Sequence, residues 1–281
     1  MTVAPVDRHI GPVRAAAGRH GLGVVAGVIL VFMFVPLVVV IGAAFNATNS
    51  IAFPPDGLSL RWFRAMFSDD RFRESLWTSF ELALQTSVLA ALMATAFALA
   101  ATRRSGPLFA ATTALANLPM VLPGVFVGVA MFTAFIYTGF PMSSRTALAG
   151  HTVYVLPFMI AIVDARLRNF DSSLEEAARV CGYRRHSTLF FVTLRMTAPT
   201  ILAGAVLAFA LSFDEVYITN FIIAQDSTVP IYILAGFRRG IDPRLNAVAA
   251  VLLVVPLTAL AVSAIVRRIS ATADSALQAQ P

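Results

Sequence analysis

Side chains capable of covalent or metal chemistry are few and dispersed in this sequence. Its 281 residues include one cysteine, Cys181, four scattered histidines and no lysine. They supply no multi-cysteine metal site, and a phosphate-binding loop is excluded because that loop requires lysine. We therefore expect no catalytic residue, no metal site and no cofactor bound by this chain.

Two adjacent carboxylates lie inside an apolar run. Asp214 and Glu215 fall in the middle of Pro199–Ile223, where a charged side chain at a membrane centre costs about 2.5–3.5 kcal/mol on insertion scales. Neighbours on a helix point about 100° apart, so the two acids cannot face one spot unless the helix unwinds. Helical spacing groups Asp214 with Tyr217, and Glu215 with Thr219.

A further acid, Glu81, lies one helical turn from Gln85 in an earlier apolar run. Carboxylates and aromatic rings along one path would favour cations through charge pairing and cation–π contact. The alternative is a hydrogen-bond network that only joins helices. The residues leave open which of Asp214 and Glu215 faces a path. Weaker polar candidates of the same kind are Asn117, His151 and Tyr154.

The elements around these acids are membrane spans, because 58% of the residues are hydrophobic, 13% are charged and the mean hydropathy is +0.78. A span needs roughly 20 apolar residues. Six runs qualify: Gly21–Phe45, Trp77–Ala101, Leu108–Tyr137, Thr146–Ile162, Pro199–Ile223 and Leu245–Val266. Pro119, Pro123 and Gly124 interrupt the third run, which is either one kinked helix or a broken one. We expect an all-α, polytopic membrane protein with six transmembrane helices.

The distribution of arginine predicts the orientation of the spans. With the N-terminus inside, thirteen of the 21 arginines fall on the inner side and eight on the outer side, as the positive-inside rule requires. This arrangement predicts a cytoplasmic N-terminal segment 1–20, a transmembrane domain 21–268 and a cytoplasmic tail 269–281. The arginines lie at the ends of apolar runs rather than on one soluble face, so nucleic-acid binding is not expected.

The polar segment 164–198, between the fourth and fifth runs, has the pattern of a compact pair of helices. Asp171 or Ser172 is suited to cap a helix whose first turn is acidic, and Gly182 is placed to end it. Arg184 begins a second helix. Small residues on the first helix would make this pair of helices a compact protrusion, or knob, that is suited to dock into a groove on another protein.

This segment resembles the coupling loop in the membrane subunits of bacterial ABC importers. The family pattern is Glu-Ala-Ala, three residues, Gly, nine residues and then a hydrophobic–x–Leu–Pro ending. Here it matches Glu176-Ala177-Ala178, Gly182 and Val192-Thr193-Leu194, with Arg195 in place of the proline and Val180 in place of a common aspartate. The resemblance implies that Glu176, Ala177, Ala178 and Gly182 dock into a cytoplasmic ATPase subunit.

A second resemblance covers most of the chain. Ser212-Phe213-Asp214-Glu215-Val216, Pro230-Ile231-Tyr232 and Asp242-Pro243-Arg244-Leu245-Asn246-Ala247 are similar to the second membrane subunit of the spermidine/putrescine permease family. The resemblance implies a polyamine as solute, with Asp214, Glu215, Tyr217 and Glu81 along its path. Relatives with the same signatures move other solutes, such as phosphonate-type or opine-type compounds.

Together these features predict the permease subunit of a type I ABC importer in the inner membrane. The resemblance implies a second, similar but distinct permease chain, a cytoplasmic ATPase dimer that holds the ATP, and an extracytoplasmic solute-binding protein. The residues do not decide whether the permease pair is homodimeric or heterodimeric. A proton-coupled secondary transporter is the alternative, with the membrane acids as a proton relay; its usual internal repeat is not evident.

Overall fold

The fold is an elongated helical bundle. The computed structural model describes residues 12–50, 53–103, 106–224, 226–240, 242–254, 257–258 and 261. Within these residues there is no β-strand, only an isolated bridge between Asn46 and Leu58, which confirms the all-α prediction. The helices are α1 (Pro12–Ala44), α2 (Arg61–Phe67), α3 (Asp70–Arg103), α4 (Pro107–Val121), α5 (Gly124–Thr138), α6 (Ser144–Arg168), α7 (Ser173–Val180), α8 (Arg185–Thr188), the π-helix η1 (Leu189–Leu194), α9 (Arg195–Phe213), α10 (Tyr217–Ile222) and α11 (Val229–Arg239).

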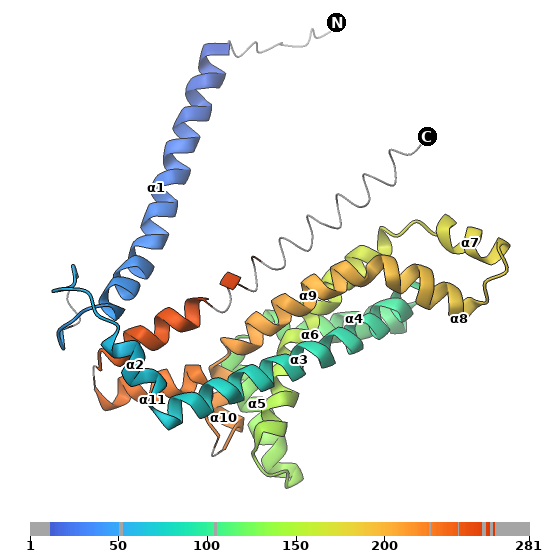
Figure 1. Cartoon of the computed structure of the whole chain (residues 1–281). Helices are drawn as coiled ribbons and strands as arrows, with labels where there is room; N and C mark the ends of the chain where they lie inside the picture. The colour runs from blue at the N-terminus through green and yellow to red at the C-terminus, as the bar shows by residue number, and fades with distance from the viewer. Residues whose placement is uncertain are drawn as a thin grey trace, which may run out of the picture.

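Three long helices, α3, α6 and α9, pack against one another and form the body of the molecule (Figure 1). Ala90, Ala94 and Ala98 line one face of α3 at four-residue intervals and are fully buried against Val155 and Met159 of α6. Small residues let membrane helices approach closely, so that van der Waals packing can hold them together without a hydrophobic driving force. The alanine stripe of α3 therefore sets the spacing of the bundle.

The first helix stands apart from the bundle (Figure 1). Its segment Gly23–Ala44 is apolar enough to span a membrane, yet its most apolar 18-residue window is 0% buried. From residue 23 to the end of α1, the buried side chains are Ala43 and Ala44 in the last turn. A helix that is apolar all round and unpacked requires lipid or another protein chain around it.

The third apolar run is broken rather than kinked. Its two helices, α4 and α5, meet at an angle of 111°. Leu122 between them is extended, at φ −83° and ψ 133°, and Pro123 precedes the first residue of α5. The proline favours this outcome because its ring pushes the preceding residue out of the helical region and it supplies no backbone donor.

The fifth run also differs from the sequence-based expectation. We expected Asp214 and Glu215 in the middle of one span, but α9 ends at Phe213 and α10 begins at Tyr217. The acids therefore lie at a helix break. A continuous helix would point one of the two carboxylates away from any polar partner, and the break removes that constraint.

Four described helices are long and apolar enough to cross a membrane, and the bent α4–α5 pair brings the number to five. A shorter apolar helix, Arg244–Val254, belongs to the sixth predicted run, whose remainder lies largely outside the described residues. The described helices are thus broadly consistent with the predicted six. The predicted tail 269–281 lies outside the described residues, and α1 begins at Pro12, within the predicted N-terminal segment 1–20.

An ion-pair network joins the short elements at the end of the bundle opposite α7 and α8. The Tyr232 hydroxyl donates to Asp69 at 2.9 Å, and Arg244 pairs with Asp242 at 2.6 Å and approaches Asp69 at 3.9 Å. Burial alone would raise the pKa of Asp69, but the bonds from Tyr232 and from backbone amides, with Arg244 nearby, hold it below its ordinary value. The network therefore ties α11 to the start of α3.

We predict that Ala94→Leu destabilises the bundle by about 1–3 kcal/mol, the usual cost of overpacking a core. The added atoms would force apart α3 and α6 where Ala94 is fully buried. Thermal unfolding of the detergent-purified protein measures the effect, with Ala96→Leu on the exposed side of α3 as control. Equal unfolding temperatures for the two variants would contradict this account of the packing.

Candidate functional site

The segment between α6 and α9 folds as two short helices that project from one end of the bundle (Figure 1). Ser172 occupies the N-cap position of α7 without a side-chain cap bond, and Asp171 Oδ1, one residue earlier, accepts the backbone N–H of Ser173, the first residue of α7, at 2.9 Å. Hydrogen bonds from the Ser173 side chain and backbone hold the pKa of Asp171 below its ordinary value. The α6 helix continues to Arg168 and the next long helical segment begins at Arg185, so the projecting part is shorter than segment 164–198.

The turn after α7 depends on glycine. Gly182 has φ +86°, in the left-handed region that L side chains disfavour and that glycine adopts freely. Its amide donates to the Arg179 carbonyl at 3.0 Å and the Tyr183 amide donates to that of Ala178, which closes the helix end. The prediction that Gly182 ends the first helix is confirmed.

The residues expected to dock lie together on the knob, which is the protrusion formed by α7, Gly182 and α8. Glu176, Ala177 and Gly182 are exposed, and Ala178 is partly exposed. Val180, between them, is 89% exposed. Exposed small and apolar side chains beside an acid form a surface that another protein could cover.

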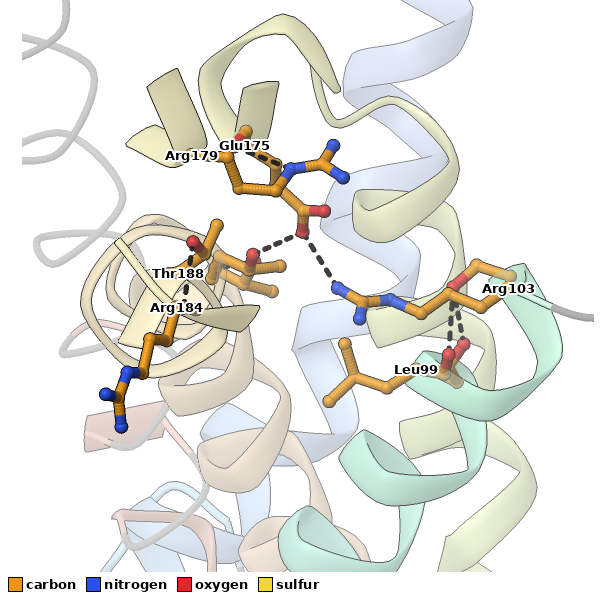
Figure 2. Close-up of polar contacts among 10 residues, drawn as sticks. Leu99, Arg103, Glu175, Arg179, Arg184 and Thr188 are labelled. Carbon is orange, nitrogen blue, oxygen red and sulfur yellow. Dashed lines mark hydrogen bonds and ion pairs between the residues drawn. The ribbon is translucent and has the colours of Figure 1, made fainter. Parts of the chain in front are cut away.

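A neighbouring acid, Glu175, points the other way, and sequence reasoning did not single it out. Its Oε1 accepts a hydrogen bond from Arg103 Nη2 at the end of α3, at 2.8 Å (Figure 2). The same oxygen also accepts the Thr193 hydroxyl of η1. The side chains of Arg103 and Glu175 are 33% and 22% exposed. The only signal in the sequence was helical spacing, which places consecutive acids about 100° apart.

At the break between α9 and α10, the Glu215 carboxylate accepts hydrogen bonds from backbone N–H groups at the beginning of α10. Its Oε1 accepts the Ile218 N–H at 2.9 Å and its Oε2 accepts the Thr219 N–H at 3.0 Å. The residue is 6% exposed. A carboxylate that replaces the missing carbonyl partners of a helix has a structural reason to be buried, and Glu215 lies among these hydrogen bonds rather than on the exposed surface.

His151 completes this buried group. Its Nδ1 lies 2.7 Å from Ser212 Oγ and its Nε2 lies 2.7 Å from Thr219 Oγ1, with Glu215 Oε2 at 3.7 Å. The imidazole is fully buried and joins α6 to both sides of the break between α9 and α10. His151, a weaker candidate in the sequence, is a central residue of this group.

Two glycines of α5, in the third apolar run, allow this helix to pack closely against α10, in the fifth run. A Cβ on Gly124 would lie 3.6 Å from Glu215 Oε1, and one on Gly128 would lie 3.1 Å from the Ile218 Cα. These residues are one turn apart on α5, so the helix presents bare backbone to α10, as small residues do at membrane helix contacts. The two breaks therefore meet in space.

Asp214 points away from this buried group. It is exposed and lines a cavity of about 520 Å³ together with Tyr217, Pro230, Ile233 and Phe237. Asp214 and Tyr217 thus share a surface, as their spacing predicted, and Glu215 is separated from them. Glu81 is exposed on α3, accepts a bond from Gln85 at 2.9 Å and is not among the residues that line this cavity.

A match to a known protein family includes both the projecting helices and the break at Asp214 and Glu215. A family model described as a binding-protein-dependent transport system inner membrane component matches residues 87–273. The match begins within α3 and includes the projecting helices, Asp214 and Glu215. The chain belongs to this family. It is therefore an integral inner-membrane permease subunit of an ABC importer rather than an enzyme, and a secondary transporter is not favoured.

Curated relatives of this permease extend over most of its length. It is 26% identical over 243 residues to the spermidine/putrescine transport system permease protein PotC of Escherichia coli strain K12, covering 85% of this chain and 91% of PotC. It is 28% identical over 233 residues to the putrescine transport system permease protein PotI of the same strain, covering 79% and 82%.

Solved structures share the fold of the permease. One is a bacterial ABC transporter that imports the acidic polysaccharide alginate, with a TM-score of 0.66 at 15% identity, covering 92% of this chain and 96% of that one. Another is the inward-facing MetNI methionine ABC transporter, with a TM-score of 0.61 at 16% identity, covering 75% and 99%.

We predict that Glu215→Ala destabilises the permease by about 1–3 kcal/mol, because two buried backbone amides lose their acceptor. Glu215→Gln should lower the free energy of unfolding less, since the side-chain amide keeps one oxygen that can accept a hydrogen bond. The measurement is thermal unfolding in detergent, with Asn220→Ala as control, an exposed position on the same α10 helix. An unfolding temperature for Glu215→Ala equal to that of the control would show that the carboxylate does not hold the break.

Proposed function

We propose that this permease subunit forms part of the path of an ATP-driven polyamine importer. It pairs with a second, similar but distinct permease chain, an ATPase dimer beneath and a solute-binding protein outside. The proposal is supported chiefly by the exposed knob formed by α7, Gly182 and α8 within a chain that matches the importer family. The chain itself binds no ATP.

In this proposal α7 lies on the cytoplasmic side, as do both termini, and docks into the ATPase through Glu176, Ala177, Ala178 and Gly182. ATP binding closes the ATPase dimer and moves the knob, and the spans change the side to which the path opens. This is coupling between two distinct sites through a two-state element.

The choice of a polyamine is supported by the cavity that contains Asp214. An exposed carboxylate that lines the same cavity as Tyr217 suits a primary or secondary ammonium group through charge pairing and cation–π contact. Both named relatives are permease proteins, one of a spermidine/putrescine and one of a putrescine transport system. The same carboxylate would repel a phosphonate, so that alternative substrate is less compatible with the cavity.

The direct test is ATP hydrolysis by the chain, affinity-purified with everything that accompanies it and reconstituted with its binding protein. Hydrolysis stimulated by spermidine-loaded binding protein is the expected result. Hydrolysis that ignores spermidine would retain the importer class and contradict the substrate. The absence of ATPase from gently solubilised membranes would contradict the proposed function itself.

We predict that Asp214→Asn raises the KM for spermidine uptake about fivefold without loss of assembly, because an exposed charge pair contributes up to about 1 kcal/mol. Uptake by proteoliposomes of the complete complex measures this. Glu74→Gln serves as control, since Glu74 is an exposed acid at the start of α3 that does not line the cavity. Equal KM values for wild type and Asp214→Asn would remove Asp214 from the path.

We predict that Gly182→Trp prevents association with the ATPase, whereas Gly182→Asn preserves it. Asparagine tolerates positive φ better than other side chains, so Gly182→Asn should keep the turn. Gly182→Ala, which is strained at this φ but small, separates the effect of backbone strain from that of bulk on the docking surface. The ATPase content of the purified complex is the measurement. A full complement of ATPase with Gly182→Trp would contradict the docking assignment.

A further inference from the structure

We propose that Glu175 transmits movement from the knob to the spans. With Arg103 and Thr193 it forms a three-residue contact, the Glu175 clamp, that joins α7 to α3 and to η1 and makes the three elements move together. This inference rests on the proposed function, in which α7 docks on an ATPase. Glu175 is a positioning residue in this scheme and touches neither ATP nor solute.

One carboxylate oxygen carries both contacts of the clamp. Glu175 Oε1 accepts Arg103 Nη2 at 2.8 Å (Figure 2) and also accepts the Thr193 hydroxyl. Within the described part of the chain, no other hydrogen bond links an α7 side chain to another helix, since Arg179 Nε bonds to the Glu175 carbonyl inside α7. Among the described residues, the side-chain hydrogen bonds from α7 to the bundle therefore all pass through Glu175.

The two adjacent acids of α7 point in different directions and therefore have different contacts. Glu176 is exposed on the knob, whereas the Glu175 side chain is 22% exposed and turned toward the bundle. Partial burial makes an ion pair less screened by solvent and salt than a surface pair. The knob can therefore dock through one face while it is held through the other.

Each partner of Glu175 leads into a long, stiff element. Arg103 is the last residue of α3, a 34-residue helix that packs against α6 and α9. Thr193 lies in η1, inside the continuous helical segment Arg185–Phe213 that ends one residue before Asp214. At 1.5 Å per residue this segment places Thr193 about 30 Å from Asp214. A displacement of α7 would thus reach the ends of two long helices, and one of them, α9, ends at Phe213 beside Asp214 of the solute cavity.

The π-helical turn and the surrounding charges suit this contact. Single π-turns inside α-helices recur at functional sites, and here the turn contains Thr193. Arg179 and Arg185 line the same cavity of about 490 Å³ as Arg103 and Glu175, and Glu175 is the only acid among its lining residues. Removal of this carboxylate would leave the arginines unneutralised and detach α7 from both helices.

The test compares solute moved with ATP hydrolysed in proteoliposomes of the complete complex supplied with spermidine-loaded binding protein. With Glu175→Ala we expect uptake to fall about tenfold, within the usual range of coupling between sites, while ATPase content and hydrolysis persist. Thr193→Val keeps the ion pair and should lower the ratio of transport to hydrolysis less. Asp164→Ala is the matched control, since it removes a 2.7 Å ion pair with Arg168 that lies within α6 alone.

Charge exchange separates coupling from folding. Arg103→Glu should resemble Glu175→Ala, and the double variant Arg103→Glu with Glu175→Arg should recover part of the lost ratio. An unchanged ratio with Glu175→Ala, or an equal loss with Asp164→Ala, would overturn the clamp while leaving the importer function in place. A wild-type complex without stimulated hydrolysis would overturn the proposed function and the clamp together.

Discussion

Every backbone amide and carbonyl within a lipid bilayer must find its partner inside the protein, and this constraint governs the two places where the apolar runs break. In the fifth run α9 ends at Phe213, and Glu215 accepts the N–H groups of Ile218 and Thr219 at the beginning of α10. His151 spans the same break from α6. The break is therefore a defined structure rather than a weak point.

The second break makes the first one possible. Because α4 and α5 meet at 111°, α5 turns its glycine face toward α10, and Gly124 and Gly128 allow the backbone of α10 to approach. A Cβ at Gly128 would crowd the backbone of α10, at 3.1 Å from the Ile218 Cα, whereas one at Gly124 would make ordinary contact with Glu215 at 3.6 Å. The irregular segments are thus buried against each other, which is the condition under which non-helical backbone is tolerated at membrane depth.

A pair of adjacent acids with different surroundings occurs near each end of α9. At one end, Glu215 is buried and Asp214 lines an open cavity; at the other, Glu175 joins helices and Glu176 is exposed. In each pair one carboxylate stabilises local structure and its neighbour is available to a ligand or a partner. Adjacent residues can divide in this way because they point in different directions from one backbone segment.

The membrane class, the helical fold and the position of the knob could all be predicted from the amino-acid sequence, because these depend on local properties. Apolar run length, the acidic helix start near Asp171 and the φ preference of Gly182 are readable without any distant partner. The pairing of Asp214 with Tyr217 was also accessible, since it requires only their spacing.

Tertiary structure decided which acid is open and which is buried, and whether the proline-containing run is kinked or broken. The separation of Glu215 from Asp214 depends on His151 and Gly124, which are more than 60 residues away, and the contact of Glu175 depends on Arg103, 72 residues earlier. Helical periodicity predicts the direction of a side chain only while the helix continues, and it contains no information about which distant group lies there. The roles of these acids therefore followed from the packing of helices whose contacts are remote in sequence.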